Sequence, residues 1–145
     1  MSTSSIVLTR VISAGIERVF EAWTRPDLLS QWFAPAADST AVVTNNVRVG
    51  GRYRIAIHQG GRDIGGAWGE YVEIDPPRRL VFTWTSDGAV HVNNSVVTLD
   101  LRRVPGGTEL TLTHTVQPDT QEGRAHGRGW AATLVSLERF LESRS

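Results

Sequence analysis

The stretch from about Thr40 to Val116 alternates apolar with polar residues and is divided by short glycine-containing breaks. Because runs joined by short turns pair as antiparallel strands, this pattern predicts a meandering sheet. Three breaks lie between alternating runs and predict hairpin turns: Gly60–Gly61, Asp87–Gly88 and Gly106–Gly107. Gly50–Gly51 interrupts a continuous run and predicts a bulge or bend. The predicted strands are 41–47, 51–58, 65–74, 79–85, 91–103 and 108–116.

Segments with helical spacing precede and follow these predicted strands along the chain. A β-branched run at 5–12 predicts a first strand, and apolar residues at 16, 19, 20 and 23 predict a helix after it. Pro26 is placed to open a second short helix. The segment 122–143 predicts a last helix of roughly 33 Å that crosses the sheet. Glycines at 123, 127 and 129 indicate either a later start, or a close approach or a hinge within the helix. The sequence predicts an α+β fold in a single domain, residues 1–145.

Strand alternation sorts the side chains into one apolar, aromatic face and one face rich in threonine and arginine. In the fourth strand the pattern places Trp68, Glu70, Val72 and Ile74 inward. His114 and Glu70 are then polar groups among apolar ones, and each needs a hydrogen-bond partner if buried. They are either satisfied structural groups or polar contacts in a cavity, and they are the two candidates for catalysis.

The composition of the chain argues against several classes of function. The chain of 145 residues has a net charge of zero and no cysteine, which argues against a general nucleic-acid binder and excludes thiolate chemistry and cysteine-ligated zinc. No apolar run is long enough to span a membrane and no signal peptide is evident, so we expect a cytoplasmic protein without membrane contact. The motifs indicate no cofactor and no metal. Five tryptophans must be accommodated, and they are the best lead to a site.

The chain resembles the START-like (SRPBCC) superfamily, and within it the branch named after the C-terminal domain of the activator of the 90-kDa heat-shock-protein ATPase. Matching segments occur in the same order over almost the whole chain: Arg10–Ala14, Val19–Thr24, Pro26, Gln31–Phe33, Val47–Gly51, Tyr53, Gly69–Tyr71, Pro76–Trp84, Ser95, Val97–Thr98, Gly107–His114 and Gly129–Trp130. The resemblance implies a helix-grip fold, a curved antiparallel sheet around a long C-terminal helix. It also implies an apolar cavity of the kind that holds lipids or polyketides in relatives.

Three functions follow as hypotheses. The first is binding of a small hydrophobic molecule between the sheet and the last helix. The residues expected to line this cavity are Trp32, Phe33, Tyr53, Trp68, Phe82, Trp84, Leu99, Leu112, His114, Trp130 and Leu134. The second is an acid–base cyclase, dehydratase or hydrolase, in which His114 acts as base or acid and Glu70 orients it. The third is a cochaperone-like regulator of a chaperone ATPase. The partners under consideration are therefore a hydrophobic ligand, a second copy in a homodimer, or a chaperone.

Arginines cluster beside the predicted turns, as the pairs Arg78–Arg79 and Arg102–Arg103 and near the bend at Arg48, Arg52 and Arg54. We expect them to be solvated surface charges paired with the acidic residues. The alternative is a clamp for a phosphate or carboxylate at the mouth of the cavity.

Overall fold

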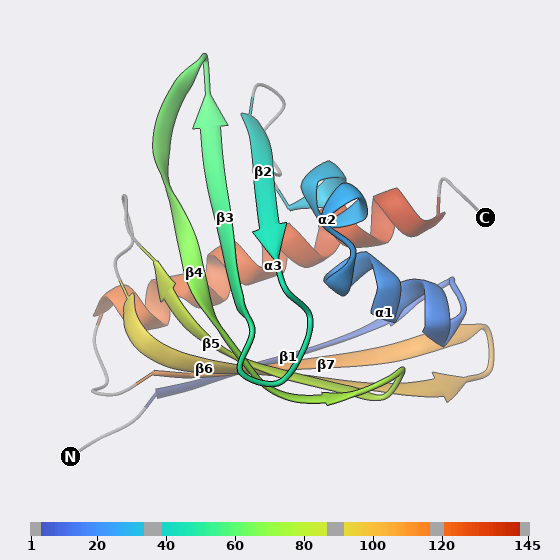
Figure 1. Ribbon diagram of the computed structural model, residues 1–145. Helices are drawn as coiled ribbons and strands as arrows, with labels where there is room; N and C mark the ends of the chain where they lie inside the picture. Colours follow the sequence, from blue (N-terminus) through green and yellow to red (C-terminus); the bar gives the residue numbers. More distant parts are fainter. Residues whose placement is uncertain (1–3, 34–38, 87–91, 117–120, 143–145) are drawn as a thin grey trace.

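The structure, a computed structural model, contains a seven-stranded antiparallel sheet and three helices, which confirms the predicted α+β fold (Figure 1). It describes residues 4–33, 39–86, 92–116 and 121–142. The elements in chain order are β1 (Ser4–Ile12), α1 (Ile16–Thr24), α2 (Pro26–Trp32), β2 (Ser39–Asn45), β3 (Arg52–Gln59), β4 (Arg62–Asp75), β5 (Arg79–Ser86), β6 (Val92–Val104), β7 (Gly107–Val116) and α3 (Gln121–Glu142).

The strands lie in the order β1-β7-β6-β5-β4-β3-β2, and every neighbouring pair is antiparallel. Figure 1 shows the sheet strongly curled, with β2 and β3 rising steeply from the plane of β1, β6 and β7. The helix α3 runs along the hollow side of this curve, α2 lies beside β2, and α1 lies next to α2 over one end of β6 and β7. The hollow side therefore holds the core.

The glycine breaks behave as turns where the structure describes them. Gly60 and Gly61 have φ values of 59° and 79° and form a two-residue connection between β3 and β4, as such hairpins require. Gly106, with φ of 90°, lies between β6 and β7. Gly50 and Gly51 lie in the bend between β2 and β3. The break predicted at residues 87 and 88 falls outside the described residues.

The predicted orientation of the fourth strand was wrong. Trp68 and Glu70 are exposed, whereas Tyr71, predicted to face outward, is buried. The reason is an irregularity in the pairing with β5: Tyr71 and Glu73 lie opposite the consecutive residues Phe82 and Val81. The extra residue between them reverses the alternation, as a β-bulge does. Val72, also predicted to face inward, is 49% exposed at the irregularity. Counting back from Ile74 therefore gives the wrong face for Val72, Glu70 and Trp68.

The last helix begins at Gln121, so the glycines near its start lie inside it, and of the alternatives given above the later start is excluded. Its apolar stripe is buried against the sheet: Trp130, Leu134, Leu137 and Leu141. Polar contacts also hold the helix in place, among them one to the sheet and one to α2. Arg10 Nε on β1 donates to Glu138 Oε1 at 2.6 Å, and Ser136 Oγ donates to the carbonyl oxygen of Trp32 at 2.7 Å. This helix is thus anchored to β1 and to the end of α2.

Candidate functional site

An apolar cavity lies between α1, α2 and the inner faces of β3, β4 and β5. Its described lining consists of aromatic and aliphatic side chains: Trp23, Leu29, Phe33, Tyr53, Ile55, Tyr71, Phe82 and Trp84. None of these is charged. The free space they enclose is about 20 Å³, which is room for roughly one water molecule.

The rings around this cavity pack against one another in tilted or edge-on pairs. Tyr53 lies at the centre, with its ring centroid 5.5 Å from that of Phe82 and 5.6 Å from that of Tyr71. Phe33 lies 6.0 Å from Trp84 and is only half-buried. These separations are those of favourable aromatic pairs. Phe33 is therefore the lining ring with most freedom to move outward.

The hydroxyl proton of Tyr53 is used in a hydrogen bond across the sheet. It donates to the carbonyl oxygen of Thr83 on β5 at 2.6 Å. Burial raises the pKa of Tyr53 well above its ordinary value, with a smaller contribution from the neighbouring Tyr71. The group remains a neutral donor at physiological pH.

The hydroxyl group of Tyr71 is placed by Asn45. The amide nitrogen of Asn45 donates to the carbonyl oxygen of Thr24 at 2.7 Å and to Tyr71 Oη at 3.1 Å. A backbone carbonyl is only an acceptor, so the first bond fixes which end of the amide is the nitrogen. Tyr71 Oη must then act as the acceptor in the second bond. Its own proton has no acceptor among the described residues, and burial raises the pKa of Tyr71, so the proton stays on the oxygen.

A second unused donor belongs to Trp23, which is 3% exposed. Its indole N–H is buried and has no hydrogen-bond partner among the described residues. Two neighbouring indoles of the same aromatic cluster are satisfied: Trp32 Nε1 donates to the carbonyl oxygen of Ala22 at 2.9 Å, and Trp130 Nε1 donates to His114 Nδ1 at 2.9 Å. Trp23 and Tyr71 thus bring two uncommitted donors to the lining of the cavity.

His114 lies outside this lining, fully buried between the sheet and α3. Because an indole N–H is only a donor, His114 Nδ1 must carry a lone pair, and the proton of the neutral ring is on Nε2. Nε2 lies 2.6 Å from Ser95 Oγ, which in turn donates to the carbonyl oxygen of Trp84 at 2.8 Å. The result is a directed chain of hydrogen bonds from α3 through β7 and β6 to β5.

This direction argues against acid–base catalysis by the pair of Ser95 and His114. Activation of a serine needs an imidazole nitrogen that accepts the hydroxyl proton, whereas here the ring nitrogen facing Ser95 is the donor. The predicted orienting partner, Glu70, is exposed, while His114 is buried, so the two do not form a pair. In this arrangement His114 joins the last helix to the sheet.

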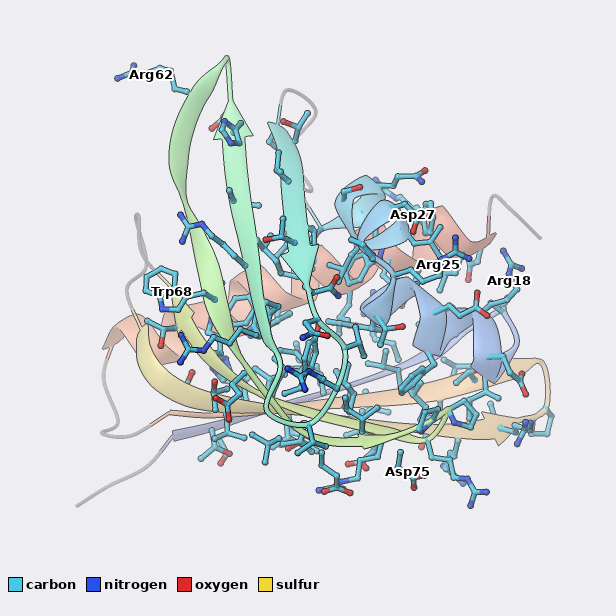
Figure 2. The ribbon with its side chains drawn as sticks, in the orientation of Figure 1. Arg18, Arg25, Asp27, Arg62, Trp68 and Asp75 are labelled. Atoms are coloured by element: carbon cyan, nitrogen blue, oxygen red, sulfur yellow. The ribbon has the colours of Figure 1, made fainter. Side chains whose placement is uncertain are left out.

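The structure separates the predicted cavity residues into three groups. Four line the cavity: Phe33, Tyr53, Phe82 and Trp84. Six are buried in the surrounding core without lining it: Trp32, Leu99, Leu112, His114, Trp130 and Leu134. Trp68 lies on the outer face of β4, 37% exposed, with the guanidinium carbon of Arg54 at 5.7 Å from its ring centroid. Figure 2 shows it projecting on the side away from α1 and α2.

Four lining residues were not predicted, each for its own reason. Trp23 belongs to the apolar stripe that predicts the first helix, and such a stripe does not show which of its side chains borders a cavity. Tyr71 was assigned to the outer face because of the bulge. Ile55 shares a strand face with Tyr53 and could have been found from alternation alone. Leu29 belongs to a seven-residue helix, too short for its position to be inferred from periodicity.

Several arginines form the expected surface ion pairs. Arg79 lies 2.8 Å from Asp100, and Arg102 lies 2.7 Å from Glu109, whose pKa the hydrogen bond from Arg102 lowers. Arg52 and Arg54 instead border an open groove of about 360 Å³ on the outer face of β2, β3 and β4. Neither Arg52 nor Arg54 is among the described residues that line the inner cavity.

Within the described ranges, no three histidine, cysteine, aspartate or glutamate side chains are grouped so that they could hold a metal ion. Among the helices that the structure describes, none has the length and apolar character needed to cross a membrane.

Comparison with known proteins supports the same architecture. The sequence matches the family model described as activator of Hsp90 ATPase homolog 1-like protein over residues 13–142. An uncharacterised protein from Rhizobium leguminosarum superposes with a TM-score of 0.83 at 28% identity, covering 98% of this chain and 96% of that chain. CalU16 from Micromonospora echinospora gives a TM-score of 0.74 at 27% identity, covering 96% and 76%.

An AHSA1-like protein from Aeromonas hydrophila gives a TM-score of 0.82 at 24% identity, covering 97% of this chain and 94% of that chain, a likeness of fold alone. A search of curated proteins finds no match to the sequence.

Proposed function

Since the chain belongs to the activator of Hsp90 ATPase homolog 1-like family, whose fold is common among ligand-binding proteins, we propose that it binds a small, uncharged, apolar molecule in the cavity between α1, α2 and β3–β5. The observation that carries this proposal is the lining itself. All its described side chains are aromatic or aliphatic, and its polar atoms are only indole and phenol groups. Such a lining suits an apolar ligand, because an apolar concavity with few polar groups is the usual form of a small-molecule site.

The size of the cavity sets how binding must proceed. Pockets for drug-sized ligands measure roughly 300–1,000 Å³, and even benzene occupies an engineered cavity of about 150 Å³. The 20 Å³ enclosed here is much smaller. A ligand larger than water therefore enters only if rings move apart, and the half-buried Phe33 is the side chain placed to do so. We propose a site that opens on binding.

Toluene is a suitable first probe because it is small, apolar and uncharged. At ten times its Kd, a ligand that binds only the folded state raises Tm by about 3–6 °C in a protein of this size. We expect the wild-type chain to show a saturable increase of this order in a thermal unfolding experiment. Intrinsic tryptophan fluorescence should change over the same concentrations, because Trp23 and Trp84 line the cavity.

A matched pair of variants distinguishes cavity binding from general solvent effects. Leu29→Phe adds a ring to a lining residue and should abolish the toluene-dependent increase in Tm. Leu137→Phe makes the same change at a buried position of α3 outside the lining and should preserve it, measured against its own Tm without toluene. Loss of the response in both variants, or in neither, would contradict the proposed site.

A further inference from the structure

We propose that the ligand of this cavity is a neutral hydrogen-bond acceptor, a ketone, aldehyde, ester or quinone, whose oxygen is bound by the Trp23 N–H and the Tyr71 O–H. The inference rests on the proposed function and names the class of molecule that the site selects. It follows from the hydrogen-bonding capacity that the lining residues leave unused.

The indole N–H of Trp23 is the first unused donor. Buried polar groups in folded proteins nearly always have a partner, and an unmade buried hydrogen bond is costly. This N–H is buried without a partner among the described residues, and its side chain lines the cavity. Trp32, whose ring centroid lies 4.7 Å away, has its N–H bonded to a backbone carbonyl. The local packing therefore permits satisfied indoles, and Trp23 is an exception at the cavity.

The hydroxyl proton of Tyr71 is the second unused donor. Asn45 presents its N–H to Tyr71 Oη, so the phenol oxygen is already an acceptor and its proton must point elsewhere. The same Asn45 amide is bonded to the carbonyl oxygen of Thr24, the residue directly after Trp23. This bridge holds the Tyr71 hydroxyl beside the C-terminal turn of α1, in which Trp23 lies. The Tyr71 hydroxyl therefore lies beside the backbone of the helical turn that carries Trp23, and both side chains line the cavity.

The other side chains of the described lining determine which kind of hydrogen-bond acceptor the cavity favours in a ligand. The described lining holds no cationic side chain, so a carboxylate would be buried without a counter-charge, which is strongly unfavourable. It also holds no carboxylate, carboxamide or imidazole, so its only side-chain acceptor atoms are the phenol oxygens of Tyr53 and Tyr71, and the oxygen of Tyr71 already accepts from Asn45. A neutral carbonyl oxygen on an apolar frame satisfies both donors and leaves nothing unpaired. Discrimination between a carbonyl ligand and its analogue without the oxygen should be strong, because the analogue leaves the buried donors unsatisfied.

The test compares 1-indanone with indane, two rigid molecules of nearly equal shape that differ by one carbonyl oxygen. Each is titrated into the full chain labelled with nitrogen-15, and the indole N–H signals are followed by NMR; a Trp23→Phe variant assigns one signal to Trp23. We expect 1-indanone, and not indane, to move the Trp23 indole proton downfield. Trp23→Phe should weaken 1-indanone about 5- to 10-fold, the loss of roughly one hydrogen bond, and leave indane within about twofold.

Two further variants control for packing. Trp32→Phe removes a neighbouring indole whose N–H is already bonded, so it should leave the ratio of the two Kd values unchanged. Tyr71→Phe removes the second donor and should again weaken 1-indanone selectively. If Trp23→Phe does not fold, the wild-type titration still tests the proposal, because the Trp23 indole signal can be assigned by standard NMR experiments on the wild-type chain.

The outcomes separate the two proposals. Binding of both molecules with equal response of the Trp23 proton, or equal weakening of both by Trp23→Phe, would overturn the acceptor assignment and leave an apolar site. Failure of both molecules to bind up to their solubility limits would overturn the proposed function and this inference with it. A downfield shift confined to 1-indanone, with selective weakening in the variant, supports both.

Discussion

Replacing Ser95 with alanine tests the hydrogen-bond chain that joins the last helix to the sheet. Ser95 is 2% exposed, and its hydroxyl both accepts from His114 Nε2 at 2.6 Å and donates to the carbonyl oxygen of Trp84 at 2.8 Å. Alanine removes both bonds and leaves the histidine N–H and the carbonyl oxygen without these partners. Because the site is buried, no solvent replaces them.

The expected magnitude follows from these two bonds. Each buried hydrogen bond contributes about 1 kcal/mol, and a donor left unsatisfied costs about 1–3 kcal/mol. Ser95→Ala should therefore lower the free energy of unfolding by about 2–4 kcal/mol, a large part of the roughly 5–15 kcal/mol typical of a domain. Ser136→Ala is the matched control, since it removes one half-buried bond, from Ser136 Oγ to the carbonyl oxygen of Trp32. It should cost only about 1 kcal/mol.

Urea unfolding followed by circular dichroism measures both variants, with the slope against urea confirming that the same surface is exposed on unfolding. A loss for Ser95→Ala no larger than that for Ser136→Ala would refute the chain as a stabilising element. NMR of the histidine ring provides an independent check. Nε2 of His114 should carry the proton and Nδ1 should not, because Nδ1 accepts from Trp130. The opposite tautomer would refute the direction that we assign.

Three further predictions concern the sheet and its cover. Gly69→Ala should destabilise the fold by about 1–3 kcal/mol in urea unfolding, because its Cβ would overlap the carbonyl oxygen of Thr83; an unchanged midpoint would contradict this close approach. Leu134→Ala should lower the free energy of unfolding by about 2–5 kcal/mol in the same assay, since this side chain of α3 is fully buried. A loss below about 1 kcal/mol would show that the helix is loosely packed. The raised pKa values of Tyr53 and Tyr71 make stability independent of these groups below about pH 10. Above that pH the unfolded state loses phenol protons that the folded state keeps, so stability should fall by at most about 1.4 kcal/mol per group per pH unit; stability that rises between pH 10 and 11 would contradict these directions.

Most of the fold is accessible from local chemistry. The pair Gly60–Gly61 predicts its hairpin because both residues adopt a positive φ that other residues avoid. The spacing from Trp130 to Leu141 predicts the buried stripe of α3 because it follows the helical period. Alternation in β3, β5, β6 and β7 also predicts the inward residues correctly, for example Tyr53 and His114. These features depend on a few neighbouring residues and need no knowledge of tertiary contacts.

The cavity is harder to predict because it depends on how elements meet. Trp23 comes from α1, Leu29 from α2 and Phe33 directly follows α2, yet they share a space with strands far along the chain. Nothing in the apolar stripe of a helix distinguishes a side chain that fills the core from one that borders a gap. The chemical role of His114 is equally hidden, since its tautomer depends on which group faces each ring nitrogen.

The bulge in β4 connects the error in prediction with the chemistry of the site. With Ile74 inward and a regular strand, Trp68 and Glu70 would also point inward, and the cavity would contain a carboxylate. The one extra residue opposite Phe82 and Val81 turns Tyr71 inward instead and leaves Glu70 exposed. The neutrality of the lining and the presence of a phenol donor thus arise from the same irregularity. Periodicity cannot reveal it, because the apolar residues of this strand occupy both alternations, so either register is consistent with the pattern and only the pairing with β5 decides between them.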